Sequence, residues 1–353
     1  MASKQAPQDS MKSTWRTADK STWGFHHRLI DTLNVYPTNL DEPTPVHQKT
    51  EKIPHLPQSS QIIWVMCYSF APMVLHQLWL RATGYEYLGT FATFQLYFTA
   101  FNAIIIRQIH VLRRLGHTWG YLDGDQHERD GVPDVGVGKI AASLYKTTGS
   151  RMALAAFLSY NPLVSPADVI SDWQWWARLS IQIGLYSILL DFWFYWYHRA
   201  MHDVSSLWKF HRKHHLTKHP NALLSAYADH EQEFFDMVGV PFATCMTMWA
   251  IGLRLGFYEW WVCHQFVAFT EVWGHSGLRV HLSPPSTMNW LLEMFDCEIV
   301  VEDHDLHHRK GWRKSHNYGK QTRLWDRIFG TCTERIESIQ ENIDYEHTAY
   351  MPL

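Results

Sequence analysis

Long apolar runs separated by polar stretches dominate the middle of this chain, whereas its first 60 residues are mostly polar. Two runs, Gln61 to Leu80 and Leu88 to Ile106, follow one another across the short loop Arg81 to Tyr87. Because a helix needs about 20 apolar residues to cross a bilayer, this pair predicts a membrane hairpin. A helical hairpin buried inside the protein gives the same pattern and stays open as the alternative.

Two further apolar segments lie in the second half of the chain. The first, Ala177 to Tyr197, ends in aromatic residues that are typical of a membrane interface. The second, Val238 to Gly274, is long enough for two passes, with Gly252 and Gly256 marking a turn between them. The pattern therefore predicts an all-α integral-membrane bundle that carries a helical cap outside the bilayer.

The number of crossings before His198 is not fixed by this pattern. Three arginines between residues 107 and 114 follow the second apolar run, and the positive-inside rule places them in the cytosol. A full crossing by residues 177–197 would then carry His198 to the opposite side. Either this segment enters the membrane only partly, or the stretch Met152 to Ile170 also dips into it.

Composition fits a chain that lies only partly in lipid. Apolar residues make up 46% of the chain and aromatic residues 15%, yet the mean hydropathy is −0.25. The five cysteines are scattered without a Cys-x-x-Cys pair, which predicts free thiols. A net charge of −3 indicates no nucleic-acid partner. The basic run Arg309 to Lys314 is expected to face anionic headgroups, an acidic protein surface or solvent.

Three short clusters of histidines are the strongest chemical signal in the chain. They are His198 and His202, then His211, His214 and His215, then His304, His307 and His308. In the first cluster, the four-residue spacing stacks both imidazoles on one helix face. In the other two, the members three apart share a face and the adjacent last histidine points about 100° away. Since imidazole is a frequent ligand of transition metals, we expect two metal ions rather than one.

Carboxylates beside these clusters are expected to hold imidazoles in place. Asp191 precedes His198 by seven residues, nearly a whole number of helical turns, so it lies on the same stripe. A carboxylate in such an apolar stretch needs a partner, for which we expect a ligand imidazole N–H or Arg199. Asp303 and Asp305 could act as ligands or orient ring N–H groups.

The order HxxxH, HxxHH, HxxHH resembles that of the fatty acid hydroxylase and sterol desaturase superfamily, whose members are integral-membrane, non-haem diiron oxygenases. The resemblance runs from about Asp191 to Thr331. It includes the His275-Ser276-Gly277 element, the Asn317-Tyr318-Gly319 segment and the stretch from Leu324 onward. This combination is specific to the superfamily and not to one activity within it.

The resemblance implies nine metal ligands, namely the eight clustered histidines and His275. A tenth is expected from His230 or His281, and the sequence does not decide between them. Around His230 the chain departs from the superfamily, because relatives often read Tyr-Ala-His-Pro-x-Glu where this chain reads Tyr227-Ala228-Asp229-His230-Glu231. Either His230 fills the place one residue late, or Asp229 replaces it.

By the same resemblance, the protein uses two irons, O2 and external electrons to hydroxylate, oxidise or desaturate an unactivated C–H bond. Sterols, sphingoid or fatty acyl lipids and terpenoid- or polyketide-type metabolites all stay open as substrates. The chain contains no GxGxxG fingerprint in strand-and-helix context and no His-Pro-Gly-Gly haem-binding stretch. Electrons are therefore expected from outside the chain, and the resemblance implies cytochrome b5 with its NADH reductase, or an NADPH reductase, as the donor. The expected location is the endoplasmic reticulum membrane, with the metal site facing the cytosol.

This interpretation divides the chain into four parts. Residues 1–60 form a polar arm that is disordered or loosely packed and lacks a signal-peptide core. Residues 61–176 form the membrane hairpin and connecting region, residues 177–335 the catalytic domain, and residues 336–353 the tail.

Two other functions use the same residues without oxygen chemistry. A zinc hydrolase would need an HExxH motif, but Phe234 stands where the second histidine belongs. A histidine-rich zinc-handling membrane protein would distribute polar ligands through several spans, whereas these clusters gather at segment ends.

Overall fold

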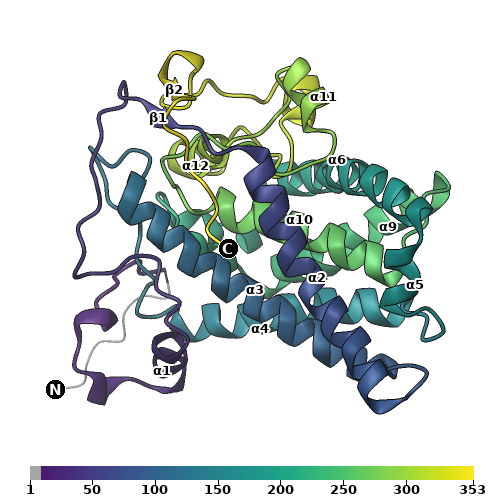
Figure 1. Ribbon diagram of the computed structural model, residues 1–353. Helices are drawn as coiled ribbons and strands as arrows, with labels where there is room; N and C mark the ends of the chain where they lie inside the picture. The colour runs from purple at the N-terminus through teal and green to yellow at the C-terminus, as the bar shows by residue number, and fades with distance from the viewer. Residues whose placement is uncertain (1–8) are drawn as a thin grey trace.

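The structure is a computed structural model that describes residues 9–353 and is mostly helical. Five long helices form the body of the molecule (Figure 1): α2 (Gln58–Thr83), α3 (Thr90–Trp119), α4 (Val137–Ser159), α6 (Trp173–Asp203) and α10 (Phe257–Gly274). Helix α10 packs against the other four and is apolar around almost its whole circumference. A helix of that kind is stable only when it is surrounded, so α10 forms the centre of the core.

Shorter elements complete the chain. They are α1 (Phe25–Thr32), α5 (Pro166–Ser171), α7 (Ser205–His211), α8 (His230–Phe234), α9 (Val240–Ala250), α11 (Asn289–Met294), α12 (Val301–Lys310) and α13 (Leu324–Ile328). Single turns of 3-10 helix lie at Trp15–Thr17, Lys20–Thr22, His214–Leu216, Ala222–Ala226 and Gln340–Asn342, and a π-helical turn, η5 (Phe235–Gly239), joins α8 to α9. Figure 1 shows α11 and α12 together at one end of the bundle, where they form a cap.

The apolar segments predicted from sequence are helical in the structure. Helices α2, α3 and α6 contain the first three, and α9 and α10 form a hairpin around Gly252, whose φ of 82° only glycine adopts without strain. Within residues 9–353, α2 is the one helix that is long and apolar enough, by length and composition, to cross a membrane. The helical fold is confirmed, and the number of crossings stays a prediction.

The N-terminal arm is packed against the bundle, contrary to the expectation of a disordered or loosely packed segment. Within its described part, residues 9–60, the side chains of Trp15, Trp23 and Ile30 are at most 7% exposed. The indole N–H of Trp15 also donates to the carbonyl of Val132. Isolated aromatic anchors in a polar run produce no periodic pattern, and this explains why sequence analysis missed them.

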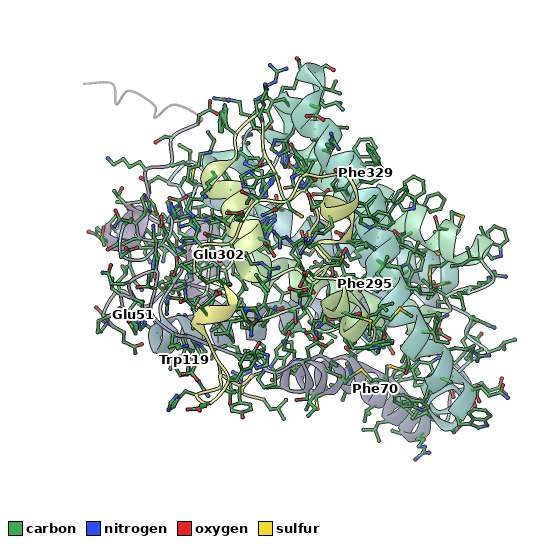
Figure 2. The ribbon with its side chains drawn as sticks, turned by 90° about the horizontal axis from the view of Figure 1, so that it is seen from above. Glu51, Phe70, Trp119, Phe295, Glu302 and Phe329 are labelled. Atoms are coloured by element: carbon green, nitrogen blue, oxygen red, sulfur yellow. The ribbon has the colours of Figure 1, made fainter. Side chains whose placement is uncertain are left out.

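The two ends of the chain meet beside the cap. Strand β1 (Ile53–Pro54) pairs in parallel with β2 (Ile343–Asp344). Seen from above, α12, marked by Glu302, lies between the segment of Glu51 and the end of α13 near Phe329 (Figure 2). Glu302 is fully buried and accepts hydrogen bonds from the backbone N–H groups of residues 336–338, so it ties the tail to α12. All five cysteines are free thiols, as predicted.

Candidate dimetal site

The structure brings nine of the predicted histidines into two neighbouring groups in the interior. The five-histidine centre contains His198, His202, His211, His215 and His307. The four-histidine centre contains His214, His275, His304 and His308. Every one of these side chains is at most 5% exposed. Histidine is seldom buried in such numbers without a shared ligand, so the grouping itself points to metal binding.

Each HxxHH motif serves both centres, but not with the pairing expected from sequence. His211 and His215, four residues apart, lie in the five-histidine centre, while His214 lies in the other. On α12, His304 and His308 join the four-histidine centre, and His307 turns to the opposite one. The expectation that members three apart share a face was wrong. On α12, a spacing of four leaves a smaller angular offset than a spacing of three. The first motif is not one helix, because α7 ends at His211 and His214 begins a 3-10 turn.

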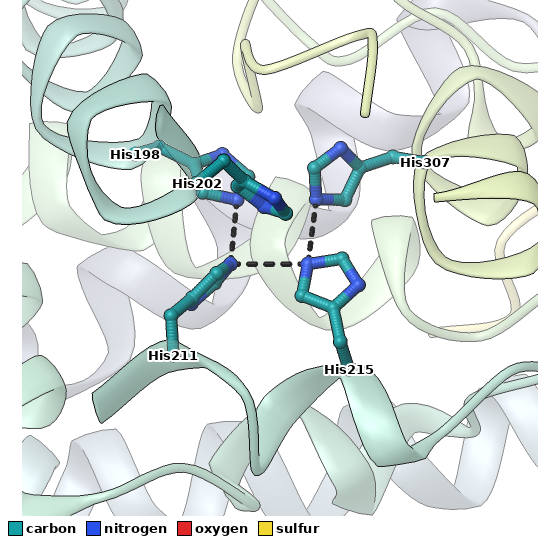
Figure 3. A group of neighbouring side chains, drawn as sticks. All are labelled: His198, His202, His211, His215 and His307. Atoms are coloured by element: carbon teal, nitrogen blue, oxygen red, sulfur yellow. Dashed lines mark hydrogen bonds between the residues drawn. The ribbon is translucent and has the colours of Figure 1, made fainter. Parts of the chain in front are cut away.

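In the five-histidine centre, the Nε2 atoms converge on one point (Figure 3). The Nε2 atom of His211 lies 3.0 Å from that of His198 and 3.0 Å from that of His215. The Nε2 atom of His307 lies 3.0 Å from that of His215. With metal–nitrogen bonds of about 2.1 Å, ligands at 90° lie about 3.0 Å apart, and those at a tetrahedral angle about 3.4 Å. These nitrogens are therefore close enough together to bind one ion.

In four of these five rings the other nitrogen, Nδ1, donates a hydrogen bond to a group outside the centre. The acceptors are the carbonyl of Tyr318 for His198, of Trp312 for His202 and of His316 for His307, and the Oε1 atom of Gln232 for His211. When Nδ1 carries the proton in this way, Nε2 holds a lone pair. Several lone pairs facing one another in a buried space repel unless a cation lies between them, so the donor set fits a metal ion.

In the four-histidine centre, two of the four rings are held in the same way. The Nε2 atom of His275 lies 3.2 Å from that of His214 and 3.0 Å from that of His304. The Nδ1–H of His275 donates to the carbonyl of Glu271 over 2.8 Å, and that of His308 donates to the carbonyl of Thr217 over 3.0 Å. These bonds leave Nε2 free to bind a metal, as in the first centre.

The two centres are direct neighbours. The rings of His215 and His308, one from each centre, stack with centroids 4.9 Å apart. His211 and His214, also from different centres, lie with ring centroids 5.5 Å apart. Burial, together with the neighbouring imidazoles, lowers the pKa of His214, His215 and His304 well below the ordinary value. The rings are therefore neutral at physiological pH, which is the form that binds metal.

Neither candidate for a tenth ligand lies in the two centres. The side chain of His230 is 59% exposed, and its Nδ1 pairs with Glu233. His281 lies beside β1, where its ring contacts that of His55 with centroids 6.1 Å apart. The unusual segment around His230 instead contributes Gln232, the partner of His211.

The two carboxylates expected to contact imidazoles have other partners. Asp191 is fully buried, and it accepts hydrogen bonds from the backbone N–H groups of residues 320–322 and from the hydroxyl of Thr322. Asp305 pairs with Arg129 at 2.5 Å and with Arg309 at 3.2 Å. Asp191 thus holds a backbone segment near the histidines and Asp305 holds two arginines, and neither carboxylate is hydrogen-bonded to an imidazole. Asp303 likewise pairs with Arg335.

Sequence analysis could not find most of the groups that orient the ligands. The carbonyls of Tyr318, Trp312 and His316 come from one irregular stretch before α13, and a backbone carbonyl leaves no signal in a sequence. Gln232 could have been found, because the departure from the superfamily pattern pointed to its segment.

A family model described as fatty acid hydroxylase matches residues 183–331, which include all nine histidines. A fatty acid hydroxylase of Lecanicillium sp. is 45% identical over 85% of this chain and 84% of its own length. An alkylglycerol monooxygenase of Xenopus tropicalis is 26% identical over 55% of this chain and 38% of its own.

A methylsterol monooxygenase of Arabidopsis thaliana is 31% identical over 49% of this chain and 61% of its own length. No solved structure matches the chain. The extent of the first likeness and the family match over the histidine region lead to one assignment. The chain belongs to the fatty acid hydroxylase family and is an oxidoreductase.

Proposed function

We propose that the protein is a membrane-bound diiron oxygenase that uses O2 and external electrons to oxidise an unactivated C–H bond of a lipophilic substrate. The observation that supports it most strongly is the convergence of nine buried, neutral imidazoles into two adjoining centres. Imidazole is a ligand that suits iron, and the two groups of imidazoles would hold one ion each. When bound, two irons supply the oxidising power that no side chain possesses.

The chain itself supplies position and shielding. Backbone carbonyls and Gln232 hold six of the nine rings through Nδ1, which keeps their Nε2 atoms directed at the centres. The aromatic ring of Phe194 covers His198, with ring centroids 4.9 Å apart, and Tyr318 lies against the same histidine at 5.7 Å. These apolar neighbours keep bulk water from the centres, which protects a reactive oxidant from side reactions.

Membrane integration is supported by apolar side chains on the outer faces of four helices. Those at least 44% exposed include Ile63, Leu75 and Leu78 of α2, Phe157 of α4, Trp173 and Ile181 of α6, and Phe242 and Trp249 of α9. Water-facing helices rarely carry so many large apolar groups, and lipid would cover them. The proposed location is the endoplasmic reticulum, with the cap and its metal centres in the cytosol.

Among lipids, a fatty acyl chain is the proposed substrate class. The relative that covers most of this chain is named a fatty acid hydroxylase, while the sterol and alkylglycerol enzymes match shorter parts. Hydroxylation is the corresponding reaction. Electrons would come from NAD(P)H through a separate protein, for which cytochrome b5 with its reductase is the proposed pair.

The test is product analysis in microsomes that contain the wild-type chain, given NADH, NADPH and isotopically heavy oxygen gas. A lipid that gains one heavy oxygen establishes a hydroxylase and identifies its substrate, and a lipid that loses two hydrogens without label establishes a desaturase. The inactive control is the double variant His307→Ala, His308→Ala, which removes one ligand from each centre. The matched control is His230→Ala, which lies outside both. A metal-loaded protein that changes no acyl, sphingoid or sterol lipid would contradict the proposal.

A further inference from the structure

Arg151 is a buried arginine whose charged head has almost no hydrogen-bond partner. It lies on α4 and is 3% exposed. Among residues 9–353, its one hydrogen bond runs from Nη2 to the thioether sulfur of Met237, a weak acceptor, over 3.1 Å. Its Nε has no partner, and the nearest carboxylate oxygen, on Glu271, is 3.6 Å from Nη2. A guanidinium presents five N–H donors, so most of its bonding capacity is unused.

Burial of such a residue lowers the stability of the folded protein. A buried charge without hydrogen-bond acceptors destabilises the fold, and the remaining ion pair here is longer than a hydrogen bond. A methionine or leucine at this position would pack without that cost. A buried arginine with so few partners therefore points to a use beyond packing, as is usual for an ionisable residue inside an apolar bundle.

Arg151 lines a cavity of about 60 Å³ between α3, α4, α10 and the turn Ala222–Ala226. Most of the lining is apolar, with Phe101, Ile105 and Ala268 among the residues around the cavity. Two residues of the lining, Leu144 and Thr147, are partly exposed. A cavity of this size holds a small polar head, while an attached chain would have to continue along the apolar walls. Apolar walls with one convergent polar group are typical of a ligand pocket.

One residue of the cavity lining also supports a metal ligand. Glu271, which lines it, accepts the Nδ1–H of the ligand His275 through its backbone carbonyl. The carboxylate of Glu271 lies between two cations, at 3.6 Å from Arg151 and 3.4 Å from Lys320. The π-helical turn η5 brings Asp236 and Met237 to the same place, and such turns are frequent at functional sites.

We propose that Arg151 binds the acyl oxygen of the substrate, a carboxylate or an ester carbonyl, and thereby fixes which carbon reaches the metal centres. This rests on the proposed function and names the group that determines its specificity. A guanidinium donates two parallel hydrogen bonds to a carboxylate and one to a carbonyl, so it can bind either an acid or an ester. Asp236, whose pKa is raised by burial to about 6, can take up a proton when a further carboxylate arrives.

The first test is equilibrium binding of radiolabelled hexadecanoic acid, its methyl ester and hexadecane to the purified, metal-loaded protein. The wild type should bind the acid and the ester about tenfold or more tightly than the hydrocarbon, as expected for hydrogen bonds from a buried cation. Arg151→Gln should lose this preference, and Arg151→Lys should keep part of it. The matched control, Arg178→Gln, changes an exposed arginine on α6 and should bind like the wild type.

Arg151→Gln must also keep its metal content and its melting temperature, because a merely structural role would lower both. If that variant does not fold, the binding preference of the wild type is still a test, since equal binding of acid, ester and hydrocarbon would overturn the proposal. Tighter binding of the acid than of the ester identifies a free acid as the ligand, and the reverse identifies an ester.

A second test separates this inference from the proposed function. In a series of saturated acids of increasing length, the oxidised carbon should keep a constant distance from the acyl end. In Arg151→Gln, several carbons should be oxidised instead of one. If Arg151→Gln oxidises the same carbon as the wild type, the inference about Arg151 is overturned while the proposed function stands. Selective acyl binding without any oxidation would instead count against the proposed function.

Discussion

The Nδ1–H of His198 donates to the backbone carbonyl of Tyr318 over 2.7 Å, and this bond joins the end of α6 to a segment 120 residues later. That segment has no regular secondary structure, so other groups must hold it. The carboxylate of Asp326 accepts the N–H groups of Tyr318 and Gly319, and Asp191 accepts the next three. Two buried carboxylates thus hold the loop that orients a metal ligand.

Replacement of Asp191 by alanine should destabilise the protein by at least about 3 kcal/mol, because it leaves three buried backbone N–H groups without an acceptor. Thermal unfolding in detergent measures the loss. Asp203→Asn, an exposed carboxylate on the same helix, is the matched control and should change stability by less than about 0.5 kcal/mol. Equal effects of the two variants would show that Asp191 does not hold the loop.

Gln232→Leu should weaken metal binding at the five-histidine centre by about 10- to 100-fold, the usual effect of removing a group that orients a ligand. The Oε1 atom of Gln232 accepts from Nδ1 of His211 over 2.9 Å, and leucine cannot replace it. Gln232→Glu keeps an acceptor and should retain the metal. Titration of the metal-free protein with Fe²⁺ distinguishes the two, and equal affinities would refute the role assigned to Gln232.

The short spacings in the sequence were enough to find the eight clustered histidines, and the resemblance added His275. It did not show which members share a centre, since the angular offset depends on the local helix and on what packs behind it. The partners of Asp191 were also missed, because nearly every residue has a backbone N–H and the sequence does not mark which ones a distant carboxylate binds. The same holds for the packing of the polar arm, where Trp15 and Trp23 are buried by contacts far along the chain.

Asp123→Asn should destabilise the protein by roughly 2 kcal/mol at neutral pH, because it removes a carboxylate that pairs with Lys49 at 2.6 Å and Arg309 at 2.7 Å. Burial alone would raise the pKa of Asp123, but hydrogen bonds from Lys49 and His219 and the charge of Arg309 lower it to about 2. A lowered pKa stabilises the fold above the ordinary pKa of about 3.9 and loses this effect as the pH falls toward 2.

The difference between wild type and Asp123→Asn should therefore stay constant from pH 7 to about pH 5 and shrink below about pH 4. Urea unfolding across this range measures it. Asp41→Asn, an exposed carboxylate in the N-terminal arm, is the control and should show no such difference. If the difference in the free energy of unfolding grows on acidification, the ionised form of Asp123 is not the one that stabilises this network.

Single histidine variants should remove metal from one centre at a time. His202→Ala takes a ligand from the five-histidine centre and His304→Ala from the other, so each should retain about one of the two ions. The double variant His307→Ala, His308→Ala should lose both, because adjacent residues on α12 face different centres. His230→Ala and His281→Ala, which lie outside, should keep both ions. Elemental analysis of protein purified with iron in the medium gives the metal content per chain.

This series also separates two ways in which nine imidazoles could bind metal. If the centres are independent, His202→Ala and His304→Ala each lose one ion, and a chelator removes the remaining ion in a single step. If one ion is needed to hold the other, either variant loses both, since His214 and His215, like His307 and His308, belong to one backbone segment and move together. Loss of metal in His230→Ala would instead restore the tenth ligand expected from the resemblance, and it would require that the segment after Tyr227 refolds when metal binds.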